Sequence, residues 1–98
     1  MSKLKTQLTS EVAGIVLEYV KAKKGRLTWI SEVTGINRRE FNRHGLAKMK
    51  FHRLLRILYA LSLSMDEEVF KEFMTEISDT ILDYADAYDE CLLTNADE

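Results

Sequence analysis

The sequence predicts an all-α fold. The chain of 98 residues contains no proline and only four glycines, so it offers few of the turns that join β-strands. Apolar residues recur at helical spacing along most of the chain, and Ser, Thr or Asn residues that could cap a helix precede these stretches. At this length we expect a single modest hydrophobic core.

The first helix is expected to begin near Thr9 or Ser10, because either hydroxyl could cap it. Lysines followed by Gly25 are typical signals for the end of a helix. Between these limits apolar residues recur every three or four positions. They are Val12, Ile15, Val16, Tyr19 and Val20.

A short second helix is expected over residues 29–34, capped by Thr28 and ended by Gly35. A third helix is expected over residues 37–44. Its first residue is an asparagine, and Glu40 three positions later completes a capping-box pattern. The next glycine along the chain is expected to end this third helix.

Residues 46–50 are expected to form a loop, and residues 51–64 a fourth helix. That helix is apolar over more than half of its circumference, so we expect it to be the central element of the core. Ser64 and Glu67 form a further capping-box pattern. It predicts a long fifth helix from about residue 65 to residue 91 or beyond.

The turn between the second and third helices fits a helix-turn-helix unit, in which a short glycine-containing turn joins two helices. Gly35 supplies a residue that tolerates positive φ, and the small Ser31 one turn earlier allows the helices to cross closely. Three apolar residues are placed to anchor the unit to the core. They are Ile30, Ile36 and Phe41.

Charge is strongly segregated along the chain. Residues 21–56 contain eleven Lys and Arg against two acids, a net charge of +9, whereas residues 57–98 contain one Lys against twelve acids, a net charge of −11. Residues 1–20 are balanced, so the overall charge of −2 hides this contrast. The middle of the chain would attract a polyanion and the last part would repel one.

The cations of the expected third helix suggest contact with DNA. Arginine pairs with guanine and asparagine with adenine in the major groove, and both also bind phosphates. The alternative for these residues is an ordinary solvated helix face, and the same alternative holds for the nearby lysines. The predicted DNA-binding set is Thr28, Asn37, Arg38, Arg39, Asn42, Arg43, Lys48 and Lys50, with Thr28 and the two lysines at the DNA backbone.

The stretches "LTWISEVTGINRREFNRH" and "FHRLLRILYALSLSMDEE" resemble the Cro/C1-type (lambda-repressor-like, XRE) helix-turn-helix family. The resemblance covers roughly residues 12–66, and Ser31 stands where the family usually has alanine. It implies a four-helix lambda-repressor-like DNA-binding domain in residues 1–64. It also implies a sequence-specific, repressor-like transcriptional regulator whose helix 37–44 contacts the major groove of double-stranded DNA.

Residues 65–98 are expected to form an acidic amphipathic helix that either packs on its own domain or dimerises. Its apolar residues follow a heptad pattern. A homodimer is preferred, because this helix has more apolar surface than one small core needs. Two copies side by side in parallel would repel each other, so an antiparallel or staggered pair is favoured. The predicted dimerisation set is Phe70, Met74, Ile77, Ile81, Tyr84 and Tyr88.

No catalytic or metal-binding constellation is recognisable. The chain lacks a nucleophile–base–orienter set and a phosphate-binding glycine loop, so we expect neither an enzyme nor a cofactor. His44 and His52 lie too far from other metal-ligating residues to suggest a metal site. The alternative function is a protein-interaction module, antitoxin- or adaptor-like, which would use the acidic helix on a helix-turn-helix scaffold.

The expected location is the cytoplasm. Cys91 is the only cysteine, so no disulfide can form within the chain, and a reducing compartment is the simplest interpretation. No apolar run approaches the roughly 18 residues of a membrane span, so no membrane partner is expected. The N-terminal lysines are not followed by the apolar run of a signal peptide.

Overall fold

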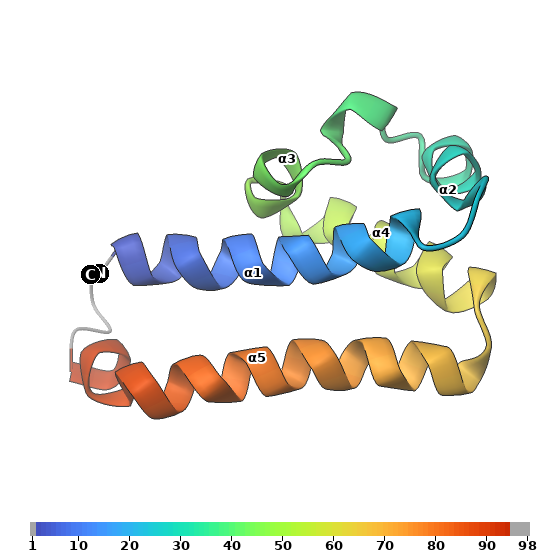
Figure 1. Ribbon diagram of the computed structural model, residues 1–98. Coiled ribbons are helices and arrows are strands. Elements are labelled where there is room, and N and C mark those ends of the chain that lie inside the picture. Colours follow the sequence, from blue (N-terminus) through green and yellow to red (C-terminus); the bar gives the residue numbers. More distant parts are fainter. Residues whose placement is uncertain (1, 95–98) are drawn as a thin grey trace.

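The computed structural model describes the backbone of residues 2–94 and the side chains of residues 7–85. All regular structure in that part is helical, as the composition predicts. Figure 1 shows the arrangement of the helices. In chain order they are α1 (Ser2–Lys21), α2 (Arg26–Thr34), the 3-10 turn η1 (Arg38–Glu40), α3 (Arg43–Ala47), α4 (Phe51–Ser64) and α5 (Glu67–Thr94).

Helix α1 lies at the centre of the molecule. Helix α5 runs beside it in the opposite direction, while α2 and α3 lie on its other side (Figure 1). Every helix, including α5, contributes to one apolar core, which stabilises the fold by removing this surface from water. The buried core residues are Ala13, Val16, Val20, Ile30, Ile36, Phe41, Leu46, Ile57, Ala60, Leu61 and Phe73.

The first helix begins earlier than its capping residues predict. Thr9 and Ser10 lie inside α1, which starts at Ser2 and ends at Lys21, before the predicted stop at Gly25. The predicted start was wrong because α5 extends alongside this part of α1 (Figure 1). Leu8 of α1 and Ile81 of α5 line the same small cavity, so packing between the helices favours the extra turns.

Helix α2 begins before Thr28, so the prediction that Thr28 caps it was wrong. Gly25 occupies the cap position with φ of 87°, and its carbonyl accepts the first helical hydrogen bond from the Trp29 N–H at 3.0 Å. The guanidinium of Arg26 donates to the carbonyl of Tyr19 at 2.7 Å. This bond ties the first residue of α2 to the end of α1 and fixes the start of the helix.

The limits of α4 agree with the predicted helix 51–64. The predicted capping box at Ser64 was wrong, because Ser64 belongs to α4 and its hydroxyl donates to the carbonyl of Leu61 at 3.0 Å. Helix α5 instead starts after Asp66, whose carbonyl accepts from the Phe70 N–H at 2.9 Å. The hydroxyl thus prolongs the end of one helix rather than capping the next.

Helix α4 is not the central element, contrary to the sequence-based expectation. It buries Ile57, Ala60 and Leu61, but a second apolar stripe on the same helix stays exposed. The physical reason is that α1, between α5 and α3, takes the central position (Figure 1). One face of α4 is therefore left uncovered within a single chain.

The predicted dimerisation residues divide between the core and the surface. Phe70 and Ile77 pack against the protein's own core, and Tyr84 is half-buried. Met74 and Ile81 remain 40% and 46% exposed, respectively. The side chain of Tyr88 lies outside the described residues. Within one chain, part of the heptad pattern is therefore used to attach α5 to α1.

Phe73, which lies beside this heptad pattern, makes the main aromatic contact of α5. It is fully buried, and its ring centroid lies 4.9 Å from that of Tyr19 and 5.7 Å from that of Phe70. Tilted ring pairs at these separations contribute about 0.5–1.5 kcal/mol each beyond the area they bury. Phe73 is thus the principal anchor of α5 on α1.

Candidate nucleic-acid interface

The tight turn after α2 has the geometry that the sequence predicts. Gly35 adopts φ of 73°, and its N–H donates to the carbonyl of Ser31 at 3.0 Å. The Ser31 hydroxyl in turn donates to the carbonyl of Ile36 at 2.6 Å. The serine is therefore more than a small residue at this point, since its side chain bonds to the backbone just beyond the turn.

The predicted anchors on both sides of the turn are confirmed. Ile30, Ile36 and Phe41 are all buried in the core. The buried Thr34 is satisfied locally, because its hydroxyl donates to the Ile30 carbonyl at 2.6 Å and accepts from the Ile36 N–H at 3.3 Å. The turn is thus held rigidly on the core from both of its ends.

The predicted third helix over residues 37–44 is wrong. The chain forms only the short turn η1 there and then breaks at Phe41 and Asn42. Asn37 caps η1 as expected, its side-chain oxygen accepting from the Arg39 N–H at 2.9 Å. Helix α3 then starts afresh, and Gly45, the predicted end of the third helix, lies inside it.

Two buried side chains explain the break. Phe41 and Leu46 both reach the core. On one continuous helix, residues five apart point roughly 140° away from each other at 3.6 residues per turn. Interrupting the helix allows both side chains to face inward, at the cost of a few helical hydrogen bonds.

Asn42 compensates for part of that cost. Its side-chain oxygen accepts from the Gly45 N–H at 2.7 Å, and its amide nitrogen donates to the Arg39 carbonyl at 2.7 Å. Asn42 is therefore the cap of α3. The sequence did carry a signal for this restart, because asparagine is among the strongest capping residues and two of them stand five positions apart.

An ion pair attaches η1 to the start of α4. The Arg53 guanidinium lies 2.8 Å from the Glu40 carboxylate, and both side chains are about one-third exposed. This hydrogen bond is the main cause that lowers the pKa of Glu40 below its ordinary value, with a further contribution from the Asn37 N–H. The pair brings the first turn of α4, and with it Lys50, next to η1.

Four exposed cations lie in η1 and in the segment between α3 and α4. We define the basic corner as Arg38, Arg39, Lys48 and Lys50, all of which are exposed. None of them forms an ion pair within the described residues. Thr28 is exposed on α2, where its side chain is not needed as a cap.

Arg43 is placed differently from the basic corner. It is exposed, but its guanidinium lies against Gly14 of α1, where an added β-carbon would be 2.8 Å from its Nη2 atom. The surrounding groove, of about 340 Å³, is also lined by Glu11, Glu18 and Thr80. The predicted DNA contacts Asn42 and Arg43 are therefore both engaged with the protein itself.

Other cations of the positive segment have structural roles that the sequence did not suggest. The guanidinium of Arg26 bonds to α1, and that of Arg53 to Glu40. Arg56 donates to the carbonyl of Thr34 at 3.0 Å and so holds α4 against the end of α2. The number of charges in the segment therefore overstates how many are available to a ligand.

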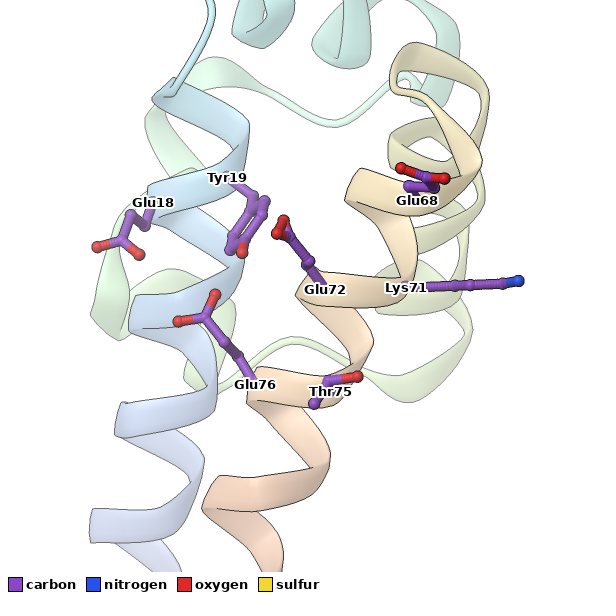
Figure 2. A pocket seen from close by; sticks show the side chains of 7 residues that line it. All are labelled: Glu18, Tyr19, Glu68, Lys71, Glu72, Thr75 and Glu76. Carbon is purple, nitrogen blue, oxygen red and sulfur yellow. The ribbon is translucent and has the colours of Figure 1, made fainter.

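The acidic part of the protein lies away from the basic corner. Figure 1 shows α5 on the opposite side of α1 from α2 and α3. Figure 2 shows the groove between α1 and α5, where Glu72 and Glu76 point toward Tyr19. This groove has a volume of about 630 Å³ and is also lined by Glu18 and Glu68.

Tyr19 closes the acidic groove at its α1 side. Its phenol is hydrogen-bonded to Glu76, and this bond, reinforced by burial and the neighbouring carboxylates, raises the pKa of Tyr19 to about 12. The proton is retained because a phenolate would face two carboxylates (Figure 2). The contact therefore joins α1 to α5 over the ordinary pH range.

Among the described residues, no cluster of three or more His, Cys, Asp or Glu side chains could hold a metal ion. No helix in that part of the chain is long and apolar enough to cross a bilayer. Comparison of the sequence with protein-family profiles, with curated proteins and with solved structures finds no match.

Proposed function

We propose that the protein binds double-stranded DNA through the basic corner and acts as a sequence-specific, repressor-like transcriptional regulator. The observation that carries this proposal is the exposure of Arg38 and Arg39, without internal partners among the described residues, at the tight turn after α2. The resemblance of the stretch around this turn to the Cro/C1-type family also supports it, although η1 takes the place of the helix 37–44 that the resemblance implies. We expect the regulator to act as a homodimer, as operators with two half-sites require.

The arginines and the lysines of the basic corner suit different parts of DNA. Arg38 and Arg39 have the planar, bidentate donors that suit guanine edges as well as phosphates. Lys48 and Lys50 are point charges that suit phosphates, and they lie between the end of α3 and the start of α4. Base contacts therefore come from η1 and not from a long recognition helix.

The position of the acidic helix α5 also favours DNA binding at the basic corner. Helix α5 carries most of the acids and lies across α1 from α2 and α3 (Figure 1), so it does not cover the turn. A duplex approaching the basic corner would meet cations while the acidic helix faced away. Repulsion from α5 would then help to orient the protein on DNA.

The first test is salt-dependent binding of the full chain to a fluorescent random-sequence duplex. We expect affinity to fall steeply with salt, and Arg38→Ala and Arg39→Ala each to lower the log–log slope by about 0.9 if each removes one phosphate contact. The control is Lys71→Ala, which removes an equal charge from α5 on the other side of α1. Absence of duplex binding at low salt would refute the proposal.

The second test addresses sequence specificity. Selection of bound duplexes from a random pool should recover a preferred sequence, and Arg38→Ala should relax the preference at particular positions. A loss of about 1–3 kcal/mol of discrimination is typical of one bidentate contact. Selection that recovers no preference would leave DNA binding intact but refute regulation of specific sites.

The second candidate function is a protein-interaction module that binds a basic partner through the acidic groove. The observation that favours it is the gathering of four glutamates around one groove between α1 and α5 (Figure 2). This candidate requires no DNA binding by the corner. The low-salt duplex experiment therefore separates the two functions directly.

A further inference from the structure

The exposed face of α4 carries an unusually regular apolar stripe. Phe51, Leu55, Tyr59 and Leu63 follow each other at intervals of four residues, so they lie on one side of the helix. They expose between 46% and 71% of their area. Such a stripe on the outside of a single chain is what a helix shows when a partner covers it.

The neighbouring helix α2 extends the stripe into a groove. Val33, which is 55% exposed, lines it together with three residues of the stripe, and the groove has a volume of about 380 Å³. Arg56 also lines it, with its guanidinium bonded to the Thr34 carbonyl. All five exposed apolar side chains, Val33 and the four of the stripe, expose 46% or more of their area, and contiguous apolar patches of a few hundred Å² on a monomer are often functional.

We propose that this groove is the interface with a second copy of the chain, in which the two α4 helices pack antiparallel about a two-fold axis. An isologous contact of this kind places the same stripe on both sides, so each large side chain meets an apolar surface. The proposal does not require DNA binding, but Lys48 and Lys50 belong both to the basic corner and to the end of α4 that meets the second copy.

The charges at the two ends of α4 favour a second copy over other partners. Lys48 and Lys50 precede the helix, whereas Asp66, Glu67 and Glu68 follow it. Antiparallel pairing brings the basic end of each copy to the acidic end of the other. It also sets the two helix dipoles in the favourable opposite orientation. A parallel pair would place like charges together at both ends.

This interface differs from the dimer that the heptad pattern of α5 predicts. In the part of α5 whose side chains the structure describes, Phe70 and Ile77 already pack on the protein's own core, which interrupts the apolar face there. The stripe on α4 makes no comparable contribution to the core. The second copy therefore gains more by covering α4.

The test is the mass of the full chain in solution, measured by sedimentation equilibrium over a range of concentrations. We expect a dimer that Tyr59→Lys weakens by at least roughly 30-fold, as expected for a central aromatic anchor. Leu82→Lys, an equally drastic change at an exposed α5 residue, is the matched control and should leave the dimer intact. Circular dichroism checks that both variants fold.

A charge exchange tests the orientation. Lys50→Glu should weaken the dimer several-fold, and adding Glu67→Lys to the same chain should restore it, because each new glutamate then faces a new lysine of the other copy. A double variant that fails to recover would overturn the antiparallel arrangement. A wild-type chain that stays monomeric, or a dimer broken by Leu82→Lys and not by Tyr59→Lys, would overturn the interface.

Discussion

The carbonyl oxygen of Glu40 lies directly over the α-carbon of Gly45, in the space that a β-carbon would occupy. Neither φ value of these residues is positive, so the glycine is needed here for close approach and not for its backbone freedom. This contact is where η1 folds back on α3. The glycine that the sequence suggests as a helix stop instead allows two short helical segments to touch.

We therefore predict that Gly45→Ala strongly destabilises the protein. The added methyl group would collide with backbone, which cannot swing aside as a side chain does, at a cost of about 1–3 kcal/mol or more. The measurement is the free energy of unfolding by urea. Gly14→Ala is the matched control, because its methyl would meet only the movable tip of Arg43. Equal losses in both variants would contradict the prediction.

Gly35 adopts a positive φ of 73°, which residues with a β-carbon rarely adopt. This gives a second prediction, for a glycine that is needed for its backbone conformation. Its added β-carbon would meet nothing within 4 Å, so the cost of Gly35→Ala is conformational only. We expect a loss of about 1 kcal/mol, and a smaller loss for Gly35→Asn, because asparagine tolerates the left-handed region better. Thermal unfolding would measure both, and the reverse order would refute the explanation.

We predict that the fold loses stability in acid through the Glu40–Arg53 ion pair. The pKa of Glu40 is lower in the folded protein than its ordinary value of 4.5, so the pair stabilises the fold fully above that pH. The contribution is lost as the pH falls through the lowered pKa. The free energy of unfolding, measured across this pH range, should depend on pH, and Glu40→Gln should reduce that dependence. Arg53→Ala, which removes the partner of Glu40, should also reduce it.

We predict that the folded protein loses stability at alkaline pH through Tyr19. Its pKa is raised from the ordinary 10.0 to about 12, so the protonated phenol stabilises the folded protein below pH 10 and this contribution is lost as the pH approaches 12. Tyr19→Phe keeps the ring contact with Phe73 and should remove that pH dependence. The phenolate absorbance of the wild type should contain a late-titrating component that the variant lacks. Identical titrations, apart from the missing residue's amplitude near pH 10, would refute the assignment.

We predict that Arg43 contributes less to DNA affinity than Arg38 does. Because its guanidinium lies against Gly14 of α1, we expect Arg43→Ala to weaken duplex binding less than Arg38→Ala does. Binding to the fluorescent random-sequence duplex measures both variants. A larger effect at Arg43 would mean that its side chain leaves α1 to reach DNA, and the contact set of the basic corner would then need to include it.

Local sequence determined much of this protein. The absence of proline and the spacing of apolar residues determined the helical class, and the extent of α4 followed from the same pattern. The turn at Gly35 and the burial of Ile30 and Phe41 were also predictable. All of these depend on residues within a few positions of each other, or on a side chain that must leave water.

Only the tertiary structure decided how residues 37–47 are divided and which cations remain available. A continuous helix satisfies the capping box of Asn37 and Glu40 and leaves only the second asparagine, Asn42, unused, but it cannot bury Phe41 and Leu46 together. The partners of Arg43 and Arg53 are distant in sequence, so no local pattern reveals them. Contacts between distant segments are set by how the helices pack, and packing is a property of the whole chain.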